Sequence, residues 1–163
     1  MIETTLGYLT LRLNEDIKRQ LKTTDDILSL ARVSDASVRT PLLLSVIQVN
    51  EDTSISNAAL TRTISQNVER IAAPQVLKLH VLISVNTQIN YKEGLRYLSQ
   101  AMNSINAHPV MTLQNTVNLP QDISKIYIET MTFDLDQQAL LWQSLKVAYQ
   151  PSIVYKLRVI GRE

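Results

Sequence analysis

Apolar residues recur at helical spacing from the start of the chain. The stripe consists of Ile2, Leu6, Leu9, Leu13, Ile17 and Leu21. Steps of three and four residues predict an amphipathic helix over residues 2–21. A helix lying on a membrane surface is the alternative, but such helices carry a basic polar face. Here the polar face mixes Glu15 and Asp16 with Lys18 and Arg19. We therefore expect this helix to pack on a sheet.

Two further helices are predicted from their N-caps. Asn90 with Glu93, and Asp134 with Gln137, have the spacing of a capping box. The expected apolar faces are Tyr91, Leu95, Leu98, Met102 and Ile105 in one helix, and Leu135, Ala139, Trp142 and Leu145 in the other. Pro109 and Pro151 are expected to end the two helices, because the residue before a proline avoids helical backbone angles.

Six segments read as β-strands. They are residues 27–33, 42–49, 76–85, 110–113, 126–133 and 153–160. Segment 42–49 is almost entirely apolar and predicts a central strand buried on both faces. Segments 76–85 and 153–160 alternate, which predicts one buried and one partly polar face. We expect the last strand to be paired inside the sheet, holding the C-terminal segment in place.

This order of elements predicts an α+β fold, with one mixed, mainly antiparallel sheet and helices packed on one face. At 163 residues, a single domain spanning 1–163 is expected. The predicted core is Leu6, Leu9, Leu13, Leu79, Val81, Ile83, Leu95, Leu98, Trp142 and Leu145.

Residues 53–74 interrupt this order. The segment is rich in Ser, Thr, Asn and Ala, and Ile64, Val68 and Ile71 allow one or two helical turns. A long connection of this kind inside a compact domain tends to be functional or disordered. We expect segment 53–74, together with the polar loop 114–124, to carry partner contacts.

Composition excludes several classes of protein. Apolar residues make up 45% and charged residues 19%, which is typical of a globular domain. The net charge of +1 provides no basic field for nucleic acid. The chain has no cysteine, no apolar run long enough to span a membrane and no signal-peptide pattern at its start. We expect a cytoplasmic product.

Motifs for catalysis, metal or cofactor binding are missing from the sequence. His80 and His108 are isolated, and no cysteine can complete a zinc site. The pair Asp25 and Asp26 reads as a turn or cap rather than as catalytic carboxylates. No serine lies in a nucleophile elbow, and no glycine-rich loop can hold phosphate. We expect no enzyme activity and no cofactor.

Charged residues in two places are candidate partner contacts. Lys78, Lys156 and Arg158 are expected on one face of neighbouring strands, which is either a solvated sheet face or a docking surface. In segment 53–74 the candidates are Arg62, Glu69 and Arg70, whose charges can pair across an interface.

The closing block resembles a known family. Trp142-Gln-Ser-Leu, followed by Tyr149-Gln-Pro-Ser-Ile-Val-Tyr-Lys, is similar to the end of the tail-terminator, or cap, family of phage-tail-like contractile injection systems of the antifeeding-prophage type. The apolar helix from Ile2, the strand 43–52 that ends in Asn-Glu-Asp, and the block 79–98 resemble the family in the same order.

This resemblance implies a structural, non-catalytic function. Family members form a six-fold ring on the end of the inner tube and sheath, which stops tube growth and anchors the last sheath layer. The implied partners are other copies of the chain, the inner tube protein and the sheath protein, with no nucleic acid and no membrane; the protein would become part of the assembled particle. Some members continue past the Tyr-Lys block, so the cap could be shared with a paralogue. The alternative is an adaptor or baseplate-associated component of such an assembly.

Overall fold

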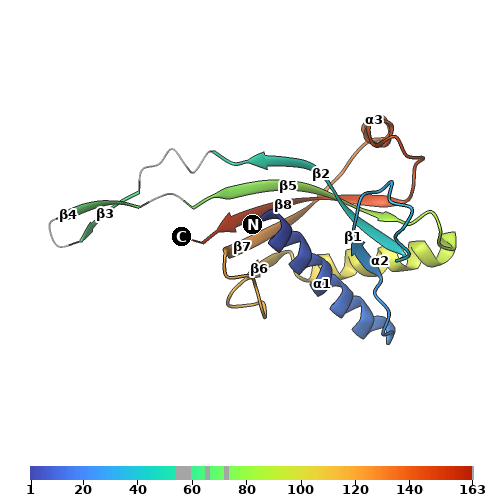
Figure 1. Cartoon of the computed structure of the whole chain (residues 1–163), viewed down its shortest axis with the longest axis horizontal. Coiled ribbons are helices and arrows are strands. Elements are labelled where there is room, and N and C mark those ends of the chain that lie inside the picture. The colour runs from blue at the N-terminus through green and yellow to red at the C-terminus, as the bar shows by residue number, and fades with distance from the viewer. Residues whose placement is uncertain (54–59, 65–66, 72–73, 163) are drawn as a thin grey trace.

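Three helices are interspersed among the strands along the chain in the computed structural model (Figure 1). The structure describes residues 1–53, 60–64, 67–71 and 74–162, and for 60–64 and 67–71 it describes the backbone only. The helices are α1 (Ile2–Leu21), α2 (Tyr91–Ala107) and α3 (Leu135–Leu145). The strands are β1 (Leu28–Leu30), β2 (Leu42–Glu51), β3 (Leu60–Ile64), β4 (Asn67–Ile71), β5 (Val76–Val85), β6 (Val110–Thr112), β7 (Ile123–Met131) and β8 (Ser152–Gly161).

Six strands form one sheet in the order β1-β2-β5-β8-β7-β6. Only β1 and β2 are parallel, and the other neighbours are antiparallel. The last strand, β8, lies between β5 and β7, as predicted: Leu157 pairs with Leu79 on one side and with Ile128 on the other. The expected α+β fold with a mixed, mainly antiparallel sheet is therefore confirmed.

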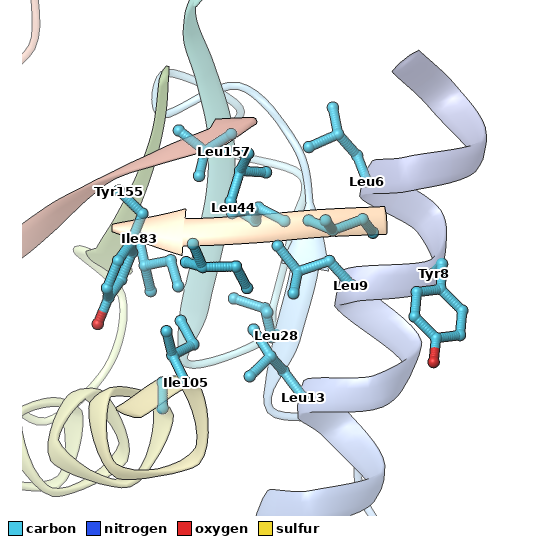
Figure 2. Close-up of a cluster of buried hydrophobic side chains, with 14 of the residues drawn as sticks. Leu6, Tyr8, Leu9, Leu13, Leu28, Leu44, Ile83, Ile105, Tyr155 and Leu157 are labelled. Atoms are coloured by element: carbon cyan, nitrogen blue, oxygen red, sulfur yellow. The ribbon is translucent and has the colours of Figure 1, made fainter. Parts of the chain in front are cut away.

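Helices α1 and α2 cover one face of the sheet and enclose the main core. Figure 2 shows Leu9 and Leu13 of α1 reaching toward the side chains of the sheet, among them Leu44. Asn14 ties α1 to the start of β1, because its side-chain amide donates to the Leu28 carbonyl at 2.8 Å and its oxygen accepts from the N–H groups of Ile27 and Leu28. These bonds satisfy a buried polar side chain, which burial would otherwise make costly.

The third helix differs from expectation, because α3 packs on the opposite face of the sheet (Figure 1). There Trp142 is buried against Leu82 and Val154. The capping box at Asp134 is present as predicted. The expected stripe is only half right, since Leu135 is 84% exposed while Leu145 is half-buried.

The end of α3 was also assigned wrongly to Pro151. The helix ends at Leu145, and Lys146 adopts a left-handed conformation with φ of 55°. The left-handed backbone turns the chain out of the helix, and the Lys146 N–H satisfies the Gln143 carbonyl of the last turn.

The buried stripe of α2 runs through smaller residues than predicted. Gly94 lies so close to Val85 that a Cβ at this position would overlap the valine side chain. This contact, together with buried Ala101, brings the helix close to the sheet. As a result Leu98 is buried as expected, whereas Leu95 is 38% exposed and does not belong to the core.

Strand β2 is buried on both faces only in its first half, and it does not lie at the centre of the sheet. It is second from the edge of the sheet, and its burial ends at Ser45. A β-bulge follows between Val46 and Gln48, and the strand continues, mostly exposed, to Glu51.

Segment 53–74 contains a β-hairpin rather than helical turns. Strands β3 and β4 pair in register from Leu60 opposite Ile71 to Ile64 opposite Asn67. Figure 1 shows this hairpin extending beyond the ends of β2 and β5, away from the helices. The expected long connection is therefore partly ordered as strands, and residues 54–59, 65–66 and 72–73 of it lie outside the described residues.

Candidate partner-binding surface

The face of the sheet opposite α1 and α2 is divided into an apolar and a charged part. The apolar part is the region around Leu82 and Val154, which α3 covers. Farther along the same strands, the side chains on this face become polar. We call this charged part the polar face; it consists of Asp52, Lys78, His80, Tyr127, Glu129, Lys156 and Arg158.

Sheet register brings three predicted residues together on this face. Lys78 of β5 lies opposite Arg158 of β8, and His80 lies opposite Lys156. Their neighbours on β5, Leu77 and Leu79, point into the core. Because strand side chains alternate between faces, Lys78, Lys156 and Arg158 share one surface, as the sequence predicted.

Asp52 anchors the cations of this surface. Its side chain is only 6% exposed, and its carboxylate oxygen Oδ2 lies 3.0 Å from Lys78 Nζ and 3.6 Å from Arg158 Nε. A buried carboxylate requires such partners, because burial without them is strongly unfavourable. Its backbone N–H also donates to the Val76 carbonyl at 2.8 Å. Asp52 therefore fixes two strands and two cations at the point where the chain leaves β2.

Lys156 forms a second ion pair near the surface. Its Nζ atom lies 2.6 Å from Glu129 Oε2, and Glu129 is largely exposed. The hydrogen bond from Lys156 holds the pKa of the Glu129 carboxyl below its ordinary value. Exposed pairs of this kind add little stability but set the position of both charges.

His80 lies between these two ion pairs on β5. Burial lowers the pKa of its imidazole below 6.5, and the positive charge of Lys156 lowers it further. Its buried Nδ1 atom has no hydrogen-bond partner among the described residues. His80 is therefore held in its neutral form at neutral pH.

The predicted residues of segment 53–74 are placed only in part. Arg62 and Glu69 are register partners in the β3–β4 hairpin, and Arg70 lies opposite Thr61. The side chains of Arg62, Glu69 and Arg70 lie outside the described residues. Asp52 of the polar face follows β2 directly, in the part of the sequence that leads from β2 to the hairpin.

Asp52 and Glu129 were not singled out as site residues from the sequence. Asp52 looks like a residue that ends a strand, and Glu129 is one exposed residue in a predicted strand. An acidic residue that lies opposite a basic one on a neighbouring strand could have been recognised as its partner. That requires the register between β5, β7 and β8, which the sequence does not provide.

The chemistry of the polar face suits contact with another protein. Three cations, Lys78, Lys156 and Arg158, face two anions, Asp52 and Glu129, which leaves a net charge of +1 from three minus two. Rigid strands hold these groups, so little side-chain ordering is needed when a partner binds. Within the described part of the chain, no three His, Asp or Glu side chains are grouped as metal ligands. None of the described helices has the length and apolar character needed to cross a bilayer.

Comparison with known families and structures gives a consistent result. The family described as the Pvc16 N-terminal domain matches residues 6–162. None of the curated proteins compared with the chain is significantly similar to it.

Two solved structures share the fold. The anti-feeding prophage cap, a tube-terminating cap, has a TM-score of 0.58 and 14% identity, and the match covers 93% of this chain and 54% of that one. The sheath/tube terminator of an extracellular contractile injection system, PVC, in its extended state, has a TM-score of 0.57 and 15% identity, covering 94% and 56%. The chain thus spans just over half the length of these two proteins, and identities this low show a common fold.

Proposed function

Because the chain belongs to the Pvc16 N-terminal domain family, we propose that it is a capping protein of a contractile injection particle. The observation that carries this proposal is that its fold matches two solved caps along 93% and 94% of its residues. Both of those proteins terminate tubes, one of them together with the sheath. The family membership agrees with the resemblance of the block after Trp142.

In this proposal, copies of the chain assemble as a ring of six on the tube end. A ring joins each subunit to two neighbours through two different surfaces, so every copy needs unlike patches on its two sides. A third surface meets the tube protein and blocks addition of the next tube layer. Anchoring of the last sheath layer completes the function.

The polar face is the proposed contact with the tube or sheath. Lys78, Lys156 and Arg158 supply donors for acidic groups of that partner. Asp52 holds Lys78 and Arg158 in place, and Glu129 holds Lys156. Arg62, Glu69 and Arg70, on the hairpin, are proposed contacts with a neighbouring copy. Complementary charges of this kind set orientation and register more than affinity.

The test is a tube-capping assay with purified tube protein. We expect the chain to bind tube ends in electron micrographs and to shorten tubes when it is present during polymerisation. Lys156→Glu should weaken end binding roughly tenfold, since it reverses one charge of the polar face. Lys92→Glu is the matched control, because Lys92 is exposed on α2, the other side of the sheet, and should bind as the wild type does.

Two results would contradict the proposal. Tubes of unchanged length with no protein at their ends would exclude capping. Binding along the tube side or to the baseplate end alone would favour an adaptor instead.

A further inference from the structure

The outer edge of β2 is only partly paired. Strand β1 covers it from Leu42 to Leu44, and the last backbone bond runs from the Ala31 N–H to the Leu44 carbonyl at 3.0 Å. Beyond that bond, no strand in the described part of the chain lies along the edge from Val46 to Glu51. An open strand edge is a template for another strand.

The β-bulge decides which backbone groups point outward. Before the bulge, Leu42 and Leu44 face β1, since the Leu42 N–H donates to the Ile27 carbonyl. After it the alternation is shifted by one residue, because the N–H of Asp52 donates to the Val76 carbonyl, toward β5. Asn50 and Gln48 then face β5 as well. Val49 and Glu51 therefore turn their N–H and C=O groups away from the sheet.

The same edge carries two exposed valines and borders a recess. Val46 is 38% and Val49 is 47% exposed, although each is a valine within a strand. The recess next to Val46 is lined by apolar residues such as Leu30, Val33 and Leu145 and by polar ones, among them Arg32 and Ser144. A strand added here would gain main-chain hydrogen bonds at the edge and a partly apolar recess for a side chain, the two components of strand addition.

The β3–β4 hairpin matches the free edge of β2 in length and has an unpaired edge of its own in the described part of the chain. Each of its strands has five residues, and the free part of β2, Val46–Glu51, has six. In the described part of the chain, β3 and β4 pair only with each other. A lone two-stranded hairpin is at best marginally stable in water, so it gains from a further strand. Figure 1 shows the hairpin extending past the end of its own β2, away from that edge.

We propose that the β3–β4 hairpin of one copy adds to the free edge of β2, from Val46 to Glu51, in a second copy. The six-stranded sheet then continues across the contact as eight strands, six from one copy and two from the next. Donor and acceptor are different parts of the chain, so the contact is heterologous and passes from each copy to the next. The inference rests on the proposed function only for its partner, another copy of this chain.

A backbone substitution tests the acceptor edge. Val49→Pro removes an N–H that faces outward, and proline is tolerated at strand edges. We expect its melting temperature to stay within about 2 °C of the wild type.

Self-association in sedimentation experiments should weaken roughly tenfold or more, because an intermolecular backbone bond is lost. Val49→Ala, which keeps the N–H, is the matched control and should associate nearly as the wild type does. Normal association of a folded Val49→Pro variant would overturn the proposal.

Cross-linking tests the pairing without relying on that variant. The chain has no cysteine, so single cysteines give unambiguous products. One copy carries Val49→Cys, and a differently tagged copy carries Thr61→Cys, Arg62→Cys, Glu69→Cys or Arg70→Cys, which covers both faces of the hairpin because register partners share a face. We expect a mixed cross-link with at least one of these four. Leu113→Cys, an exposed position beside the opposite strand β6, replaces Val49→Cys in the control and should give none.

The outcomes separate this inference from the proposed function. Each mixture is examined both free and bound to tube ends. Cross-links in either state support the pairing. If the chain caps tubes but none of the four pairs cross-links, or if cross-links form only between copies that carry the same tag, hairpin addition is wrong and capping stands. If the chain does not bind tube ends yet the pairs cross-link, capping is wrong and the pairing stands.

Discussion

Trp142 is the residue that holds α3 to the molecule. It is the only tryptophan, is 4% exposed, and lies against Leu82 and Val154. Its ring meets Tyr149 edge to face, with 5.6 Å between ring centroids. Most other residues of α3 are exposed, so the attachment of the helix depends largely on this side chain.

Replacing Trp142 by alanine should cost about 3–5 kcal/mol in the free energy of unfolding, the usual range for emptying a large aromatic site. Urea denaturation measures it. Leu140→Ala is the control on the same helix, since Leu140 is 66% exposed and should change stability by no more than about 0.5 kcal/mol. A loss below about 1 kcal/mol for Trp142→Ala would mean that α3 does not depend on this contact.

His80 should make stability depend on pH. Its pKa in the fold is below the ordinary value of 6.5, first because of burial and then because of Lys156. As pH falls below 6.5 the unfolded chain takes up a proton more readily than the folded one. The contribution of His80 is therefore fully present above pH 6.5 and is lost as pH falls toward the folded pKa.

Denaturation of the wild type and His80→Gln at pH 7.5 and 5 measures this effect. The wild type should lose more stability than the variant over this interval, because glutamine does not titrate. Equal losses in the two proteins would contradict the prediction. Glu129, the register partner of Lys156, has a pKa below its ordinary value, so this carboxyl does not account for a difference.

At the scale of the element, the strands of the sheet and the β3–β4 hairpin are held differently. Strand β8 pairs with two neighbours along nearly its whole length, whereas the described hairpin strands pair only with each other. The ends of β2 and β5 are already joined by the backbone bond between Asp52 and Val76. The hairpin is therefore not needed to close this pair of strands.

A short turn in place of the hairpin tests this conclusion. Replacing residues 53–75 by Asn-Gly leaves Asp52 and Val76 as the bonded pair flanking a two-residue turn, for which Asn-Gly is favoured. We expect this variant to fold and to melt within a few degrees, about 4 °C, of the wild type. It should also lose self-association. Failure to fold would show that segment 53–75 belongs to the folding unit, and normal association would show that it carries no contact between copies.

At the scale of the whole molecule, the sheet has two faces with different roles. One face carries α1 and α2 over the main apolar core. The other is covered by α3 at one end and presents the polar face at the other. An exposed charged surface, an open β2 edge and a projecting hairpin are three unlike features, as the proposed ring would need for contacts with two neighbours and the tube.

The sequence by itself determined the elements whose signal is local. The stripe from Leu6 to Leu13, the alternation of residues 76–85 and the capping box at Asp134 all depend on spacing within a few residues, and all are present in the structure. Alternation also placed Lys78, Lys156 and Arg158 on one face, because a period of two fixes the face once a strand is identified.

Tertiary structure alone decided what depends on residues far apart in the chain. Leu95 is exposed because Gly94 brings α2 close to Val85. Helix α3 lies on the face opposite α1 and α2 because Trp142 packs against Leu82 and Val154 there. Asp52 became the anchor of the polar face because sheet register places β5 and β8 beside it. Local periodicity carries no information on which strands become neighbours, since pairing is chosen by packing of the whole sheet. The open edge of β2 follows from that same choice.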